Sequence, residues 1–307
     1  MAEIPSVKEK YTGKIEEIAF GNCIAGGADG MPFLSFENTL KRRPIIAGEV
    51  VDDLTDYPEM AAEMFDGRQK DPVGWANMWK EIGADMICIR FPGAAPDKKG
   101  TSPEDAAGIV RRISDKTGLP VMVIGCGIAD IDNRIAEAVG GAMKGTKVIL
   151  GRTEEHEYKK ISAVSMSNGH AVLAFSNLDI NLAKQMNILL TDFGVERNSI
   201  TMDPLMAALG MGLDYSYSVN ERIRLPALSG DRMLQVPMVC DCTGAWDVAD
   251  AVSTDDPSLG DAKHRVAWWE AMTALAAMLS GADILIMRGP GAADMTRVYA
   301  EELTGVS

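Results

Sequence analysis

The chain has 307 residues, of which 47% are apolar and 24% are charged, a balance typical of a globular protein with a well-filled core rather than of a disordered or fibrous one. Its formal net charge of −14 disfavours nucleic acid as a partner, because that binding depends on lysine and arginine side chains that neutralise phosphates. No apolar run reaches the roughly 18 to 20 residues that cross a bilayer, and the N-terminus lacks the apolar segment of a signal peptide, so the sequence predicts a cytoplasmic protein with no membrane partner.

The first predicted element is a β-hairpin near the N-terminus. The segments GKIEEIAFGN (13–22) and MPFLSFENT (31–39) flank a glycine-rich AGGADG turn (25–30), a pattern typical of two short strands joined by a loop. We therefore interpret residues 1–42 as an N-terminal extension whose hairpin closes the N-terminal mouth of the domain that follows. That domain is predicted to occupy residues 43–307.

Short runs of Val, Ile, Leu and Met recur along this domain. They lack polar alternation, as expected of strands that are buried on both faces of a parallel sheet. We predict eight strands, at residues 43–50, 85–91, 119–125, 146–151, 170–176, 199–203, 236–241 and 283–288.

Segments of helical length separate the strands. One of them opens with Ser102 as an N-cap and Pro103 at the first helical position, and several close on glycine, which suits the residue after a helix end. Eight strand–helix units predict a (β/α)8 TIM barrel, since a doubly wound open sheet normally stops at about five to seven strands. The helical segments are 72–83, 102–118, 128–143, 154–169, 177–194 and 261–281.

The loops at the C-terminal ends of the strands form the working face of such a barrel. Residues that follow the apolar runs are therefore the candidate ligand contacts, and their polar or small side chains suit a flat, amide-rich ligand. For Asn177 and Asp203 the other interpretation is that they cap the helices that follow them. The candidates are Gly125, Asn177, Asp203, Asp241, Cys242, Thr243 and Gly289.

Two similar phrases each contain an arginine at a predicted strand end. GADMICIRFPGAAP (83–96) holds Arg90, and GADILIMRGPGAAD (281–294) holds Arg288. The arginines could recognise an anion, or they could brace Glu49 at the end of the first strand, since strands one, two and eight adjoin when a barrel closes. We favour the structural cluster. The Pro-Gly-Ala-Ala that follows each arginine is interpreted as a small-residue loop that lets a ligand approach the backbone.

The sequence carries no pattern of metal ligation or nucleophilic catalysis. Three histidines are far apart, and five cysteines are scattered and odd in number, which is typical of a reducing compartment. No histidine follows another strand to act as a base for Cys242, so a cysteine hydrolase is not indicated. We predict no catalytic residue and no metal on this chain.

Extended blocks of the chain resemble one known family, the small subunit of the corrinoid iron-sulfur protein. In archaea its counterpart is the delta subunit of the acetyl-CoA decarbonylase/synthase complex. The resemblance covers the whole chain. The blocks are EKYTGKIEEIAFG, RPIIAGEVVDD, DPVGWANMWKEIGADMICIR, VMVIGCG and ITMDPLMAALGMGLDYSYSVNERIRLPAL.

This resemblance implies a barrel related to methyltetrahydrofolate-binding methyltransferases and paired with a larger subunit. The larger subunit carries a 4Fe-4S cluster and a corrinoid-binding domain, and the cobamide lies between that domain and the barrel. A methyltetrahydrofolate methyltransferase would load the methyl group, and acetyl-CoA synthase/CO dehydrogenase would receive it in the reductive acetyl-CoA pathway. The chain would not be catalytic alone.

Two other functions fit the same barrel. One is a free-standing pterin-dependent methyltransferase, in which Asn177, Asp203 and Asp241 would bind the pterin and help to protonate its N5. The other is a sugar- or carboxylate-processing enzyme, for which the only support is fold analogy.

Overall fold

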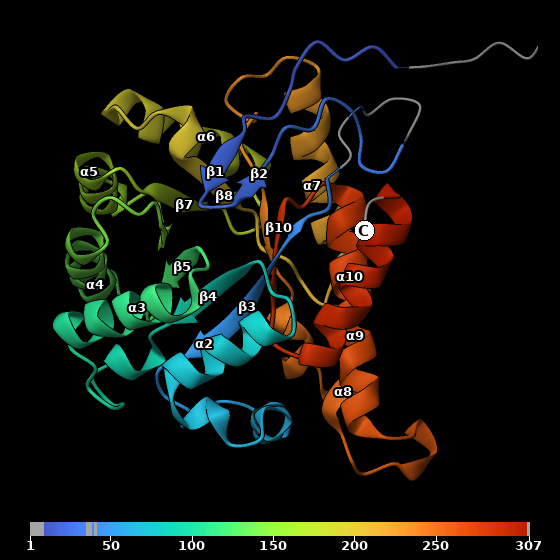
Figure 1. The fold of residues 1–307 in the computed structure, drawn as a ribbon. Coiled ribbons are helices and arrows are strands. Elements are labelled where there is room, and N and C mark those ends of the chain that lie inside the picture. Colours follow the sequence, from blue (N-terminus) through green and yellow to red (C-terminus); the bar gives the residue numbers. More distant parts are fainter. Residues whose placement is uncertain (1–8, 35–38, 40–41, 306–307) are drawn as a thin grey trace, which may run out of the picture.

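The computed structural model describes residues 9–34, 39 and 42–305. Within them, eight parallel strands form a nearly closed barrel in the order β8-β7-β6-β5-β4-β3-β10-β9 (Figure 1). The first and last strands of this order, β8 and β9, are joined by a parallel bridge between Met202 and Met238. Met202 N also donates a hydrogen bond of 2.9 Å to Pro237 O. The predicted TIM barrel is confirmed. Its strands are β3 (Ile45–Val51), β4 (Met86–Arg90), β5 (Val121–Ile124), β6 (Ile149–Thr153), β7 (Ala171–Phe175), β8 (Ile200–Asp203), β9 (Val239–Asp241) and β10 (Ile284–Met287).

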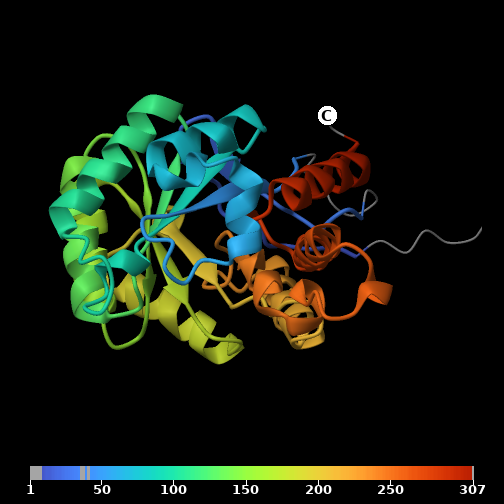
Figure 2. The same cartoon turned by 90° about the horizontal axis from the view of Figure 1, so that it is seen from below.

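Helices surround the strands, as the view from below shows (Figure 2). The predicted N-cap is confirmed, because Ser102 Oγ accepts a hydrogen bond of 3.1 Å from Asp105 N. Short 3-10 helices lie at Glu63–Phe65, Arg68–Lys70, Pro92–Ala94, Arg197–Ser199, Cys242–Asp247 and Pro257–Leu259. The α-helices are α1 (Glu59–Ala62), α2 (Pro72–Glu81), α3 (Pro103–Thr117), α4 (Ala129–Ala142), α5 (Tyr158–Asn168), α6 (Ile180–Phe193), α7 (Leu213–Leu228), α8 (Ala249–Val252), α9 (Ala262–Ser280) and α10 (Pro290–Thr304).

The two Pro-Gly-Ala-Ala segments differ in structure: the prediction of a loop is wrong for the second, whereas the first lies in the connection between β4 and α3. After β10 the segment forms the first turn of α10, with Pro290 at the first helical position, where a missing N–H costs nothing and the fixed φ suits the helix. After β4 the segment forms the 3-10 helix Pro92–Ala94. The repeated phrase therefore places similar arginines at two strand ends but does not make two equivalent loops.

The N-terminal hairpin is present, but its second strand comes earlier than predicted. Strands β1 (Ile18–Phe20) and β2 (Cys23–Ala25) pair antiparallel around a tight turn at Gly21, whose φ of 57° suits the left-handed conformation that such turns need. The AGGADG segment is therefore not the turn. The predicted second strand, MPFLSFENT, includes residues 35–38, which lie outside the described residues.

The inward face of this hairpin fills the N-terminal end of the barrel. Ile18, Phe20, Cys23 and Ala25 are buried in the same cluster as the inward residues of the barrel strands. A Cβ atom added at Gly21 would lie 3.7 Å from Pro120, which directly precedes β5. The expected closure of this mouth is confirmed, and ligands have access to the strand ends from the opposite side.

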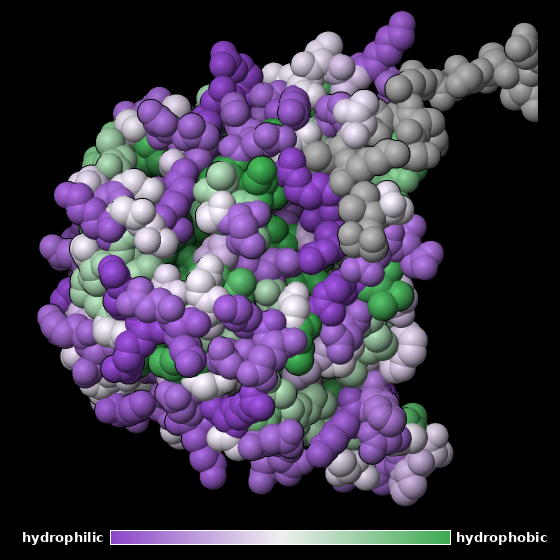
Figure 3. Space-filling model, in the orientation of Figure 1, coloured by the Kyte–Doolittle hydropathy of each residue, from purple (hydrophilic) through white to green (hydrophobic). Residues whose placement is uncertain are grey.

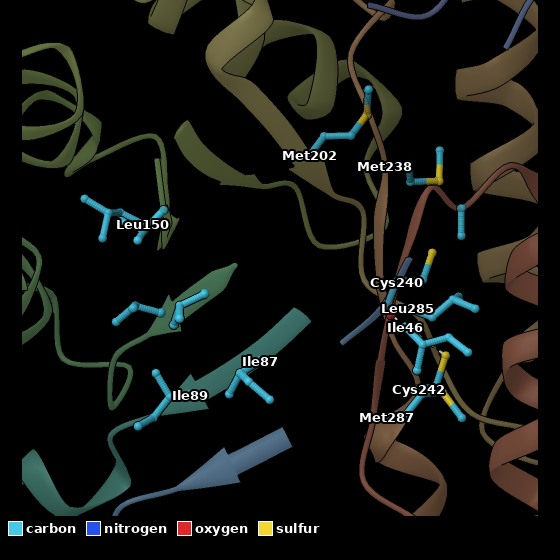
Figure 4. Packing of buried hydrophobic residues seen from close by; sticks show 14 of the residues in the cluster. Ile46, Ile87, Ile89, Leu150, Met202, Met238, Cys240, Cys242, Leu285 and Met287 are labelled. Atoms are coloured by element: carbon cyan, nitrogen blue, oxygen red, sulfur yellow. Dashed lines mark hydrogen bonds between the residues drawn. The ribbon is translucent and has the colours of Figure 1, made fainter. Parts of the chain in front are cut away.

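A second apolar layer lies between the strands and the helices. Figure 4 shows Ile46, Cys240 and Leu285, from three neighbouring strands, pointing into this layer. Trp79 of α2 lies so close to Gly48 of β3 that a Cβ atom there would overlap its ring. The indole Nε1 of Trp79 also donates to Glu49 O at 2.7 Å, so packing beneath β3 fixes the strand end that carries Glu49.

Polar side chains dominate the face of the molecule that Figure 3 shows. On the face shown in Figure 3, hydrophobic residues occur in small groups between hydrophilic ones. No helix in the described part of the chain combines the length and the apolar character needed to cross a membrane.

Candidate functional site

A continuous series of ion pairs crosses the C-terminal mouth of the barrel. In the described part of the chain, three arginines alternate with three carboxylates, so that each inner member contacts two partners. We call this group the arginine–carboxylate chain. Its members, in order, are Arg288, Glu49, Arg90, Asp241, Arg152 and Asp203.

One half of this chain is the predicted cluster around Glu49, and it is confirmed. Arg288 Nε donates to Glu49 Oε2 at 2.6 Å, and Arg90 Nε lies 2.8 Å from Glu49 Oε1. The carboxylate of Glu49 is fully buried. The cluster forms because β3 pairs with β4 on one side and with β10 on the other.

The other half links strands on the far side of the mouth. Asp241 Oδ2 accepts from Arg90 Nη2 at 2.5 Å and from Arg152 Nη2 at 2.8 Å. Arg152 Nε then donates to Asp203 Oδ2 at 2.6 Å. Asp203 and Asp241, which we predicted as ligand contacts, are thus held by arginines of the protein itself.

The charges in this chain compensate one another. Burial alone would raise the pKa of Asp241, but Arg90 and Arg152 outweigh it and hold that pKa well below its usual range. Burial would lower the pKa of Arg90, yet Asp241 and Glu49 raise it well above its ordinary value. At Asp203 burial is the larger effect, and it raises the pKa although Arg152 opposes it. Each guanidinium therefore stays charged and already has a carboxylate partner.

A further buried acid, Glu270, supports the Arg288 end of the chain. Its carboxylate accepts hydrogen bonds from Arg288 N at 2.5 Å, Gly289 N at 2.9 Å and Trp246 Nε1 at 2.8 Å. Burial raises its pKa to about 7, although these hydrogen bonds oppose the shift. We did not predict Glu270 because it lies within α9 rather than after a strand. A lone acid in the apolar run AWWEAMTALAAM was the available signal.

Neither Asn177 nor Asp203 caps an α-helix, so that interpretation is wrong for both. Asp179 caps α6, accepting from Asn181 N at 2.8 Å. Asn177 is exposed at the end of β7 with φ of 43°, and its side chain makes no hydrogen bond to the described residues. Asp203 instead accepts from Leu205 N at 3.0 Å in a local turn.

The side chains at and directly after the end of β9 already have contacts within the protein. Asp241 Oδ1 accepts from Thr243 Oγ1 at 2.6 Å and from Thr243 N at 3.2 Å. The thiol of Cys242 is completely buried among apolar side chains, and burial raises its pKa well above the ordinary value. Thr243 therefore orients Asp241, and Cys242 packs in the core away from the mouth.

At the two predicted glycines, Gly125 and Gly289, a carboxylate of the same chain lies close to the backbone. A Cβ atom at Gly289 would lie 2.8 Å from Glu270 Oε2, and one at Gly125 would overlap the Asp132 carboxylate. Asp132 accepts hydrogen bonds from the N–H groups of the two residues after Gly125, at 2.7 and 2.9 Å. Both glycines are thus required by internal contacts, and Gly125 additionally lines the mouth.

Two hollows open at this end of the barrel within the described residues. They meet at Arg90, Gly125 and Cys126, which line both. We call them the β3 hollow and the β6 hollow, after the strand whose end each borders. The β3 hollow is lined by residues that include Glu49, Asp53, Tyr57, Lys98 and Arg288.

The β6 hollow has a different character. Its lining residues include Asn133, Thr153 and Phe175. The Arg152 guanidinium lies over that ring, with its Cζ 5.1 Å from the ring centre. No three His, Cys, Asp or Glu side chains among residues 9–34, 39 and 42–305 are grouped to hold a metal ion.

Comparison with known proteins identifies a matching family. Residues 21–298 match the family described as "CO dehydrogenase/acetyl-CoA synthase delta subunit". The chain is 30% identical to the acetyl-CoA decarbonylase/synthase complex subunit delta of Methanocaldococcus jannaschii, over 96% of this chain and 76% of that protein. It is 31% identical to the same subunit of Methanothermobacter thermautotrophicus, over 96% and 77% of the two chains.

Solved structures show a similar fold at low sequence identity. Dihydropteroate synthase from Thermus thermophilus matches with a TM-score of 0.57 and 12% identity, over 95% of this chain and all (100%) of that one. The Xanthomonas albilineans enzyme with 4-aminobenzoic acid matches with a TM-score of 0.54 and 14% identity, over 91% and 100%. At this level of identity the likeness concerns the barrel alone.

Substitution of Glu49 tests the arginine–carboxylate chain. Glu49→Gln leaves two arginines facing a neutral amide, so we expect a loss of about 3–5 kcal/mol in the free energy of unfolding. Guanidinium chloride unfolding followed by tryptophan fluorescence measures it. The matched control is Glu63→Gln, which breaks an exposed pair with Lys263 and should cost about 1 kcal/mol or less. Equal losses in the two variants would contradict the account.

The raised pKa of Glu270 predicts a pH dependence of stability. Between its ordinary value of 4.5 and about 7, the folded chain holds a proton on Glu270 that the unfolded chain has released. Stability contributed in this way is present at low pH and is lost as the pH rises through 7. The unfolding free energy of the wild type minus that of Glu270→Gln should therefore fall as the pH rises from 4.5 to about 7 and level off above that. A difference that stays constant over this range would show that Glu270 does not titrate there.

Proposed function

The chain belongs to the family of the CO dehydrogenase/acetyl-CoA synthase delta subunit, and from that premise we propose that it is the small subunit of a heterodimeric corrinoid iron-sulfur methyl carrier. Its C-terminal mouth covers one face of a cobamide that the larger subunit also holds. The bound cobamide supplies a cobalt centre that carries a methyl group from a methyltetrahydrofolate methyltransferase to acetyl-CoA synthase/CO dehydrogenase. This chain binds and shields that centre and is not catalytic alone.

The internal neutrality of the mouth carries this proposal. Arg90 has two carboxylate partners, and Arg152 and Arg288 are likewise paired. A barrel that binds a phosphorylated or carboxylate substrate needs cations or N–H groups that are free to meet the anion. Here a neutral ligand with amide groups can approach without displacing an ion pair, and the flat face of a corrin is such a ligand.

The state of the cysteines supports placing the 4Fe-4S cluster on the larger subunit. Cluster ligation requires thiolates, usually four of them. Burial raises the pKa of Cys88 to about 12 and that of Cys23 to about 11, so both thiols stay protonated and are poor ligands. Cys240 and Cys242 are equally buried in the core.

The predicted contacts divide into two roles under this proposal. Asn177 and Gly125 face the ligand directly, since the first is exposed with a free amide and the second lines both hollows. The remaining candidates act by holding the surface in shape, through the arginine–carboxylate chain or through packing. They are Asp203, Asp241, Cys242, Thr243 and Gly289.

Retention of corrinoid by the assembled protein tests this function. We expect the chain to bind corrinoid stably only together with the larger subunit, and Asn177→Ala to lower retention roughly 5-fold, the effect of about one hydrogen bond. Absorbance of the corrinoid after gel filtration measures it. The melting temperature should fall only slightly, because the Asn177 side chain has no partner in the described structure and alanine fits its φ of 43° less well than asparagine does.

Asn198→Ala is the matched control, because Asn198 is exposed near the opposite mouth, just before β8. It should retain corrinoid like the wild type. The proposal fails if the lone chain binds methyltetrahydrofolate and methylates free cob(I)alamin at enzymatic rates. That result would favour the free-standing methyltransferase.

A further inference from the structure

Two buried oxygen atoms of the β6 hollow have no hydrogen-bond partner in the described structure. They are Thr153 Oγ1, on a residue that is 1% exposed, and Asn133 Oδ1, on a residue that is 5% exposed. Both residues line the same hollow. A buried polar atom without a partner costs free energy, so two of them at one opening indicate groups that a ligand satisfies.

The partners of Asn133 determine what its free atom can do. Its Nδ2 donates to Glu157 Oε2 at 3.3 Å. Because a carboxylate only accepts, the nitrogen of the amide must face Glu157, and Oδ1 is left as a free acceptor. The Thr153 hydroxyl at the end of β6 can donate or accept. Together they offer an acceptor and a donor to one small polar group.

The rest of the hollow disfavours an anion. Asp132, Glu154 and Glu157 line it and would repel a carboxylate or phosphate. Arg152 cannot compensate fully, since its Nε and Nη2 already donate to Asp203 and Asp241. The Arg152 guanidinium lies over the Phe175 ring, with its Cζ 5.1 Å from the ring centre. A guanidinium is planar, so a planar group can stack against it.

We propose that the β6 hollow is a subsite for a neutral carboxamide. The N–H of such a group donates to Asn133 Oδ1, and its carbonyl oxygen accepts from the Thr153 hydroxyl. This inference rests on the proposed function, because the primary amide side chains around a corrin ring are the expected source of the group. The lactam edge of a pteridine presents the same donor and acceptor and is the other source.

The first test uses the full chain assembled with the larger subunit and loaded with dicyanocobinamide. Thr153→Val should lower its retention by about 5- to 10-fold, as expected for one lost hydrogen bond, and Thr153→Ser should restore it. The melting temperature of Thr153→Val should stay equal or rise, because the deleted hydroxyl has no partner in the unliganded protein. A purely structural hydroxyl would show the opposite pattern, with lower stability and unchanged retention, and would overturn the proposal.

The second test changes the ligand. Cobinamide derivatives in which one side-chain amide is hydrolysed to a carboxylic acid place a negative charge at one known position. We expect at least one isomer to bind the wild-type assembly about tenfold more weakly than cobinamide, with a smaller difference in an Asn133→Leu, Thr153→Val double variant. Equal binding of all isomers, together with unchanged cobinamide retention by the double variant, would overturn the subsite.

Failure of the subsite and failure of the proposed function are distinguishable. If the wild-type assembly holds no more corrinoid than the larger subunit alone, the proposed function fails. If the lone chain binds methyltetrahydrofolate and Thr153→Val weakens that binding, the carboxamide chemistry stands while the corrinoid source is overturned.

Discussion

The mouth of this barrel depends on the compensation of buried charge. Each ion that is taken from water into a protein costs several kcal/mol, and removing one partner of a buried pair leaves the other uncompensated. The alternation of arginine and carboxylate across the mouth meets this constraint with partners drawn from six different strand ends. Neighbouring contacts support it, since Trp79 holds the backbone of Glu49 and Glu270 holds that of Arg288.

This pairing of charges indicates which class of ligand the mouth of the barrel can bind. A barrel mouth with unpaired cations can bind phosphates and carboxylates. The three arginines of this mouth are instead paired with carboxylates of the same chain. The groups left without a partner at this mouth include neutral hydrogen-bonding ones, namely the Asn177 amide and the oxygens of Asn133 and Thr153. A surface of this kind suits the large cofactor that we propose a second subunit brings to it.

The barrel and half of the site could be predicted from sequence because they depend on local pattern and strand adjacency. Uninterrupted apolar runs marked all eight strands, and the order of a closed barrel placed Glu49 between Arg90 and Arg288. The link from Asp241 to Arg152 was not predictable in this way, because it spans the mouth between strands that do not pair. Glu270 was missed because a helix supplies it from outside the ring of strand ends. The start of α10 was missed because a proline followed by small residues, directly after a strand, resembles a loop.

Hydrogen–deuterium exchange on the proposed heterodimer, with and without corrinoid, tests most directly which face of the barrel would cover the cofactor. The account predicts slower exchange on corrinoid binding in residues 125–133, 152–158 and 176–179, at the C-terminal mouth, with no change in residues 18–25 of the hairpin. Protection confined to the hairpin end, with unchanged exchange at the strand ends, would contradict it.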